Sequence, residues 1–171
     1  MNPVFRPYQT EEDFWRMREF LRRVFLLNDC QEQSWHVARL EYARWHTCLN
    51  CANVRLEDVA TLWEADGEII AFVMPDGGPG EAHFNVHPGL DTPALEEEML
   101  AVAEERLAET RQDGSRSLCV WTPGNDARRK EMLARHGYAP GEWVETQWRR
   151  RLDAPLPNVP PPFGYTIRPL G

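Results

Sequence analysis

Two residues in this sequence, Glu81 and His83, have the types and spacing of acid–base groups. They stand two positions apart in a short segment that alternates apolar and polar side chains. A carboxylate and an imidazole are both able to accept a proton from a substrate, so each is a candidate general base. Both can equally be ordinary surface groups of a strand beside a loop.

A second group with possible chemistry is the run from His46 to Cys51, which contains Cys48 and Cys51 as a Cys-x-x-Cys pair. Two thiolates and an imidazole are suitable zinc ligands, and a fourth would have to come from Cys30 or His36. No second Cys-x-x-Cys occurs in the chain. We therefore predict reduced structural thiols, Cys119 included, and no metal site.

The composition is that of one globular domain. The chain has 171 residues, 42% of them hydrophobic, and a formal net charge of -8. Nucleic-acid binding needs clustered positive charge, which this balance does not favour. Residues 1–10 hold no apolar run typical of a signal peptide, and no stretch approaches the ~20 apolar residues that span a bilayer. We expect a cytoplasmic protein with neither a nucleic-acid nor a membrane partner.

The elements that must position these residues follow from the periodicity of the apolar side chains. Period-two runs predict strands at 4–8, 59–65, 68–75, 81–88, 117–122 and 143–148. Three- and four-residue spacing predicts helices at 11–25, 34–48, 93–107 and 126–136. Thr10 and Ser34 are the expected N-caps of the first two helices, and Asp66-Gly67 predicts a tight hairpin. The order predicts an α/β domain with a mixed sheet and helices packed against it.

The second predicted helix is rich in aromatic side chains. Trp35, Tyr42 and Trp45 recur there at roughly helical intervals. Such a stripe can line a substrate pocket or pack the core, and we predict that it packs the core.

In this order the elements resemble the GNAT N-acetyltransferases over nearly all of residues 4–152. Three segments carry the resemblance: Phe5-Arg6-Pro7 before an acidic helix start, the strand at 84–88 leading into the long helix, and Asn125 before the helix that ends on Gly137-Tyr138. The resemblance implies a mixed sheet of about six to seven strands flanked by about four helices. It also implies transfer of an acetyl group from acetyl-CoA to a primary amine.

The resemblance further implies where the cofactor would lie. The strand at 84–88 would hold the pantetheine arm through its backbone at Asn85, Val86 and His87, and Asn125 would lie near the cofactor. Asn125 can alternatively be the cap or turn residue of the helix that follows it. For such a transfer the base for the acceptor amine would be Glu81 or His83, which are candidates by their own chemistry and their place on the central strand.

The stretch matching the family's diphosphate loop departs from the family pattern. Members bind the diphosphate at a helix start through an R/Q-x-x-G-x-G/A loop, whose glycines and free amides approach the phosphates. Residues 89–98 have no Arg or Gln at the start and no glycine pair. Pro93 removes one amide donor, and Asp91 and three glutamates add negative charge. Leu133 stands where members often carry a tyrosine acid, so we expect weak or absent acetyl-CoA binding.

The C-terminal region suggests a second copy of the same unit. We expect a GNAT-like domain at 1–153, a proline-rich linker at 154–164, and the truncated start of a second GNAT-like domain at 165–171. Ile167-Arg168-Pro169 repeats the opening Phe5-Arg6-Pro7, 162 residues later.

Two functions are compatible with these observations. The first is an N-acetyltransferase that, in its full-length form, acetylates a small-molecule or peptide amine. The second is a non-catalytic GNAT-like module that supports a catalytic half or binds a partner. The missing C-terminal half and a second copy in a homodimer are the expected protein partners.

Overall fold

The computed structural model describes residues 3–146, 148, 150–151, 153, 155 and 158–169. The chain divides into two units, residues 1–140 and 141–171. The helices and strands all belong to the first unit. They are, in chain order, β1 (Val4–Pro7), α1 (Glu11–Leu27), α2 (Val37–Tyr42), the π-helix η1 (Ala43–Ala52), α3 (Leu56–Val59), β2 (Thr61–Ala65), β3 (Glu68–Met74), β4 (Glu81–Val86), α4 (Pro93–Leu107), β5 (Glu109–Thr110), β6 (Arg116–Ser117), β7 (Cys119–Trp121) and α5 (Ala127–Arg135).

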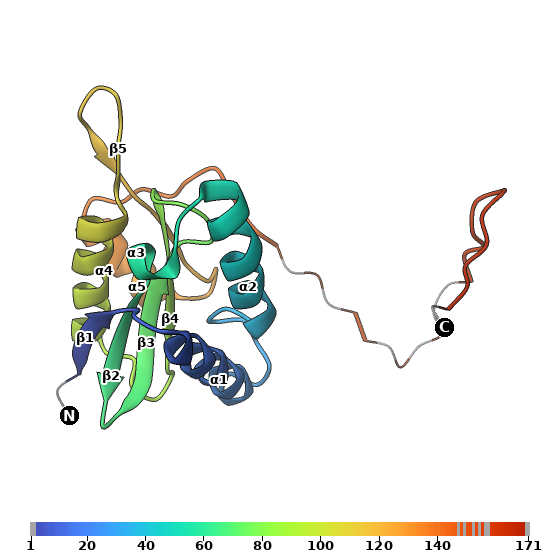
Figure 1. Cartoon of the computed structure of the whole chain (residues 1–171), viewed down its shortest axis with the longest axis horizontal. Helices are drawn as coiled ribbons and strands as arrows, with labels where there is room; N and C mark the ends of the chain where they lie inside the picture. The colour runs from blue at the N-terminus through green and yellow to red at the C-terminus, as the bar shows by residue number, and fades with distance from the viewer. Residues whose placement is uncertain are drawn as a thin grey trace. The chain divides into compact units, whose positions relative to one another are not determined.

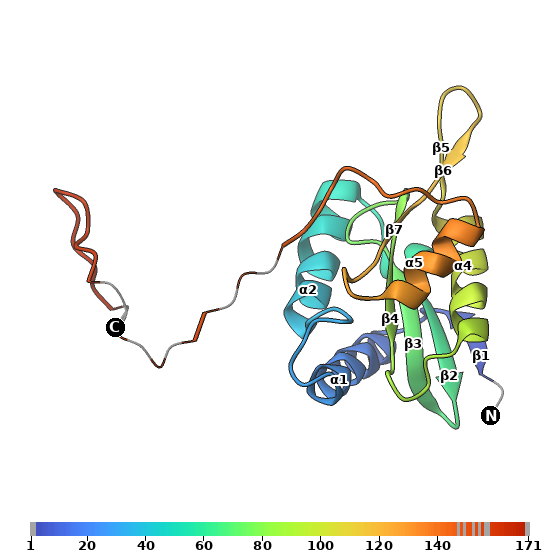
Figure 2. The ribbon, with the colours of Figure 1, turned by 180° about the vertical axis from the view of Figure 1, so that it is seen from behind.

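The centre of the first unit is a five-stranded mixed sheet in the order β1-β2-β3-β4-β7. The first four strands are antiparallel neighbours, and β7 pairs parallel to β4 after the crossover through α4. Strands β5 and β6 form a separate two-stranded hairpin. The predicted α/β fold with a mixed sheet is confirmed. Helices α1 and α2 cover one face of the sheet and α4 and α5 cover the other (Figures 1 and 2).

Each face of the sheet carries its own apolar core. Alternate β3 residues point to opposite faces, so that Phe72 packs with α1 while Ala71 packs with α4. Met17 and Met99 are fully buried on these two helices. The sheet is therefore covered on both faces, as predicted for this mixture of strands and helices.

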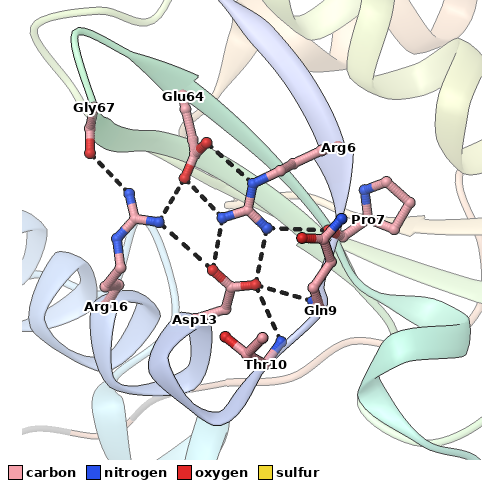
Figure 3. Close-up of polar contacts among 8 residues, drawn as sticks. All are labelled: Arg6, Pro7, Gln9, Thr10, Asp13, Arg16, Glu64 and Gly67. Atoms are coloured by element: carbon pink, nitrogen blue, oxygen red, sulfur yellow. Dashed lines mark hydrogen bonds and ion pairs between the residues drawn. The ribbon is translucent and has the colours of Figure 1, made fainter.

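A network of ion pairs fixes the edge of the sheet to α1 (Figure 3). The Arg6 guanidinium donates to both carboxylate oxygens of Asp13 at 2.8 and 2.6 Å, and also to both oxygens of Glu64 at 3.1 and 2.9 Å. Arg16 pairs with Glu64 at 2.6 Å. Asp13 also accepts the backbone N–H of Thr10, which completes the predicted cap. Hydrogen bonds from Arg6 lower the pKa of Asp13 to about 2.

The helix predicted at 34–48 differs from the structure. It begins at Val37, with His36 as its cap, because the Ser34 hydroxyl contacts β4 instead of the helix amides. From Ala43 the chain winds as a π-helix, which ends at the left-handed residue Asn53. A π-helix has more residues per turn than an α-helix, so the side chains that share a face differ from those predicted with α-helical spacing. The core prediction holds for Trp35 but is wrong for Trp45, in the π-helix, and for Tyr42, the last residue of α2, which are 54% and 55% exposed.

The predicted strand at 143–148 is also wrong for the residues that the structure describes, 143–146 and 148. Trp143 is 86% exposed and Trp148 is 90% exposed. A segment of alternating apolar and polar residues is stable as a strand only where its apolar face packs against other residues. The apolar side chains of Trp143 and Trp148 are exposed instead. The described residues of 141–169 contain turns but no helix or strand. No helix among the described residues is long and apolar enough to cross a membrane.

Candidate functional site

The parallel strands β4 and β7 separate before β4 ends. Their paired residues are Glu81 with Cys119, Ala82 with Val120, and His83 with Trp121. Beyond His83, β4 runs on to Val86 without a partner on this side, because β7 ends at Trp121. Ligands of open α/β sheets bind in the crevice beyond the carboxyl ends of such strands. A cavity of about 280 Å³ lies there, and Val86, Pro88, Asn125 and Arg129 are among its lining residues.

His83 lies at the point of separation, buried between two indole rings. Its ring stacks on Trp121 with centroids 5.6 Å apart and an interplanar angle of 8°, and it lies 4.9 Å from the ring of Trp35. The residue is 5% exposed, and Nε2 has no hydrogen-bond partner among the described residues. Burial lowers the pKa of His83. The neutral imidazole is therefore favoured, which is the form that a general base requires.

Glu81 has a different environment from His83. Its Oε1 accepts the backbone N–H groups of Asp76 and Gly77 at 3.0 and 3.2 Å, and its Oε2 accepts the indole N–H of Trp121 at 2.8 Å. Burial opposes ionisation, but the His83 contact and these donors outweigh it and lower the pKa of Glu81 to about 2. A carboxylate held this way anchors the β3–β4 loop and is a weak proton acceptor at neutral pH.

Two of the three predicted cofactor residues at 85–87, Asn85 and Val86 of β4, contact the loop between α1 and α2, and the third, His87, follows the end of the strand. The Asn85 side chain is fully buried, and its Oδ1 accepts the backbone N–H of Trp35 at 2.7 Å. The backbone N–H of Val86 donates to the Ser34 hydroxyl at 3.1 Å. His87 turns away, with its backbone N–H bonded to Ile70 and its ring nitrogen accepting from Gly89. The loop thus occupies the edge of β4 that faces the crevice.

The start of α4 is capped from within the chain. The Thr92 hydroxyl accepts the backbone N–H of Leu95 at 3.2 Å, and its carbonyl accepts that of Glu96 at 3.1 Å. Pro93 at the first position of the helix has no N–H. Two of the first three positions of the helix, Pro93 and Leu95, therefore offer no free amide to an anion, whereas the Glu96 bond is the ordinary first bond of the helix.

Two ion pairs join this helix start to α5. Arg129 donates through Nε and Nη2 to Glu96 Oε1 at 2.7 and 2.5 Å, and both side chains are buried, at 4% and 1% exposure. Arg128 pairs with Asp91 just before α4. Burial raises the pKa of Glu96, although Arg129 opposes the shift. Arg128 and Arg129, at the start of α5, are therefore both neutralised by carboxylates of the chain itself.

Asn125 lies beside these ion pairs, at the cavity wall. The cap of α5 is its neighbour Asp126, whose carboxylate accepts the backbone N–H of Arg129 at 3.0 Å, while the carbonyl of Asn125 accepts that of Ala127. The structure thus brings Asn125 and Val86 to one cavity. Sequence reasoning missed Asp126 as the cap, although an Asp before a helix is the usual signal.

The cysteine run does not assemble a metal centre in the described part of the chain, where no three His, Cys, Asp or Glu side chains converge. Cys48 is buried in the core, and burial raises its pKa to about 11. Cys51 is exposed, with its sulfur 3.7 Å from His46 Nε2. Leu133 is buried in the core between α4 and α5.

The comparisons with known proteins agree with this architecture. No family model matches the chain. It is 28% identical over 116 residues to a mycothiol acetyltransferase from Pseudarthrobacter chlorophenolicus, covering 66% of this chain but only 33% of that protein.

Solved structures share the fold at low sequence identity. The PaiA N-acetyltransferase of Thermoplasma acidophilum, in complex with coenzyme A, superposes with a TM-score of 0.52 and 12% identity, over 84% of this chain and 94% of that one. The Escherichia coli ribosomal-protein-S18-alanine N-acetyltransferase superposes with a TM-score of 0.51 and 13% sequence identity. The match covers 80% of this chain and 77% of that one. The first unit of this chain therefore has the fold of the GNAT N-acetyltransferases.

Proposed function

We propose that this chain is a domain of a larger N-acetyltransferase, which acetylates a primary amine, and that this domain supports the reaction without itself holding acetyl-CoA. The observation that supports this proposal is the buried Glu96–Arg129 ion pair at the start of α4. By the family resemblance, the cofactor diphosphate would rest at this helix start.

A diphosphate needs free amide donors and unpaired positive charge. The Thr92 hydroxyl already accepts the amide of Leu95, and Pro93 has none. A diphosphate would also have to replace Glu96 on Arg129, which would leave the buried carboxylate without its hydrogen-bonded partner and with only Arg128, 3.6 Å away, at a cost of up to about 3–5 kcal/mol. The residues present do not fit the cofactor.

The edge of β4 gives a second argument. The pantetheine arm would bind the backbone of β4 by resemblance, and the Val86 N–H that faces the crevice already donates to Ser34. Trp35 is bonded to Asn85 by its backbone. Binding of the arm would first require the loop to release both contacts.

The larger protein is inferred from two observations. The match to the mycothiol acetyltransferase covers only a third of that protein. In the second unit, apolar side chains such as Phe163, Tyr165 and Ile167 are mostly exposed. We propose that 154–164 links this domain to a second GNAT-like domain that begins at 165–171, and that the second domain holds acetyl-CoA.

A second candidate function is catalysis by this chain, with His83 as the base. Its support is the buried Nε2 of His83 where β4 and β7 separate, which has no hydrogen-bond partner among the described residues and lies 3.6 Å from Glu81 Oε2. Thr122 Oγ1 and Trp35 Nε1 are also buried without partners among the described residues. A bound acyl group and amine would supply partners for such atoms.

An acetyl-transfer assay distinguishes the two candidates. The purified chain is incubated with acetyl-CoA and a panel of amines containing glucosamine, spermidine and a lysine peptide, and acetylated products are measured by mass spectrometry. We expect no transfer above the uncatalysed background, for the wild type and for His83→Ala alike. Transfer that His83→Ala lowers by about 10²–10⁴-fold would establish the second candidate and contradict the first.

A further inference from the structure

The π-helix η1 brings together the side chains of His46 and Cys51, which the proposed function does not use. The Cys51 sulfur lies 3.7 Å from His46 Nε2, and both residues are exposed. In an α-helix, residues five apart point about 140° away from each other. A π-helix forms its hydrogen bonds between residues five apart, so that their side chains lie one above the other. The contact between this thiol and this imidazole therefore depends on the π-helical winding.

Winding of this kind is itself unusual. π-helical turns are rare, occur mostly as single turns within α-helices, and are frequent at functional sites. Here the winding continues over ten residues, from Ala43 to Ala52. The Tyr42 ring lies 4.9 Å from the His46 ring and limits the positions that the imidazole can take. A nucleophile, a base within reach of its proton and a third group beside the base form the arrangement that activates thiols in proteins.

Cys51 also lines a cavity between the end of η1 and the loop from β3 to β4. The cavity has a volume of about 370 Å³, within the range of small-molecule sites, which is roughly 300–1,000 Å³. It shares no lining residue with the cavity beyond β4. The other residues that line it are Thr47, Ala52, Asp76, Gly77, Gly78 and Glu81. A small molecule in this cavity lies beside the residue that carries the thiol.

The charges of the wall restrict the ligand. Asp76 pairs with Arg39 at 2.9 Å, which neutralises one of the two carboxylates. The other belongs to Glu81, whose pKa is lowered to about 2 by the donors described above despite its burial, so that it is ionised at neutral pH. The wall therefore repels an anion and admits a neutral or cationic molecule.

We propose that Cys51 is a thiol-modification site, at which the cavity admits a small neutral or cationic disulfide and His46 activates the thiol for exchange. A disulfide supplies both the oxidant and the leaving group, so the step needs no further reagent. The site is independent of the proposed function, since it needs neither acetyl-CoA nor an acceptor amine.

The exchange is a transfer of one sulfur bond. His46 Nε2 takes the proton of the Cys51 thiol, and the thiolate attacks one sulfur of the ligand. An S–S bond forms between Cys51 and that sulfur while the S–S bond of the ligand breaks. The released thiolate takes the proton from His46. Cys51 is thereby oxidised to a mixed disulfide, and the departing half of the ligand is reduced to a thiol.

The test is the rate of mixed-disulfide formation at each exposed cysteine. The 171-residue chain is incubated at pH 7 with bis(2-hydroxyethyl) disulfide, which is small and neutral, and the modified peptides are quantified by tandem mass spectrometry. Cys51 is expected to react about tenfold faster than Cys30 and Cys119, which are also exposed. Oxidised glutathione is the anionic probe. The preference of Cys51 for the neutral disulfide over oxidised glutathione is expected to exceed that of free cysteine about threefold or more.

One variant and one control test the role of the imidazole. His46→Phe keeps a ring beside Tyr42 but removes the base, so it is expected to lower the Cys51 rate at pH 7 about tenfold. His136→Phe removes an exposed imidazole after α5 and is expected to leave the Cys51 rate unchanged.

The pH dependence of the wild type gives a second measurement, which decides if His46→Phe fails to fold. An unassisted thiol loses about tenfold in rate for each pH unit below its pKa, because only the thiolate reacts. Between pH 8 and pH 6.5, the rate at Cys51 is therefore expected to fall less than the rates at Cys30 and Cys119.

The outcomes separate this inference from the proposed function. Equal rates at the three exposed cysteines, or a Cys51 rate that His46→Phe leaves unchanged, overturn the inference. A preference of Cys51 for the neutral disulfide that only matches that of free cysteine overturns the assigned class of ligand. Each of these results leaves the proposed function standing, and binding of coenzyme A to the chain contradicts the proposed function alone.

Discussion

The buried Glu96–Arg129 pair gives the sharpest prediction about stability. Replacing Arg129 by methionine keeps the length of the side chain but removes both hydrogen bonds of Glu96, at 1% exposure, and leaves it only the longer ion pair with Arg128 at 3.6 Å. Breaking a buried pair from one side costs about 3–5 kcal/mol, whereas replacing both partners by apolar residues is often neutral. Arg129→Met should therefore be strongly destabilising, and Glu96→Leu combined with Arg129→Met should recover most of the loss.

The same variant has a predicted pH dependence. Burial raises the pKa of Glu96 and Arg129 opposes that shift, so removing Arg129 raises it further. A carboxyl group with a raised pKa in the folded state binds its proton more tightly than in the unfolded state. The buried Glu96 carboxyl group therefore costs no stability while the pH is below its unfolded pKa. The loss of stability grows as the pH rises through its folded pKa. Arg129→Met should therefore be closer to wild-type stability at pH 5 than at pH 7.

Urea unfolding followed by circular dichroism measures both effects. For a domain of this size, 3–5 kcal/mol lowers the midpoint by about 2 M. Arg135→Met is the matched control, because Arg135 pairs with Glu97 on the same two helices but is 56% exposed, so little change is expected. If Arg129→Met shifts the midpoint no more than this control, the pair is open to solvent and our argument against a diphosphate at this helix start fails.

Three further predictions follow from the contacts around the sheet. The pKa of Asp13 is lowered to about 2, so its stabilisation, about 2–2.5 kcal/mol, is fully present above the unfolded pKa of 3.8 and lost as the pH falls through 2; Asp13→Asn should abolish that part of an acid-unfolding curve. Cys48 should resist a thiol reagent in the folded protein while the exposed Cys30, Cys51 and Cys119 react, and reaction of all four at equal rates would contradict its burial. Asn85→Ala leaves the buried N–H of Trp35 unpaired and should cost about 1–3 kcal/mol by urea unfolding, a loss that Asn125→Ala at the cavity wall should not reproduce.

Local chemistry accounts for the elements that the sequence predicted. Asp66-Gly67 adopts the positive φ values of a tight turn, and the hairpin of β2 and β3 forms around it. The alternation of apolar and polar side chains predicted β4. Pro93, together with apolar side chains at helical spacing, predicted α4. Each of these signals lies within a few residues of the structure it specifies, which is why it can be read without the fold.

The errors arose where distant residues compete with local signals. Ser34 is a good helix cap, but the Val86 amide takes its hydroxyl from a strand 52 residues away. Trp143 and Trp148 alternate like a strand, but they lack a buried face. For the site, the absence of the diphosphate pattern was visible in the sequence, whereas the pairing of Glu96 with Arg129, 33 residues apart, was not. Only the packing of α5 on α4 reveals it.

Isothermal titration of coenzyme A into this chain tests the central claim most directly. PaiA from Thermoplasma acidophilum, solved in complex with coenzyme A, is the positive control under the same conditions. No saturable heat is expected for this chain up to about 1 mM coenzyme A, whereas a ligand that binds with a dissociation constant of about 10 μM would give a full isotherm and add about 2.7 kcal/mol of stability. A saturable isotherm of one coenzyme A per chain, weakened by a bulky substitution at Val86, would contradict the central claim.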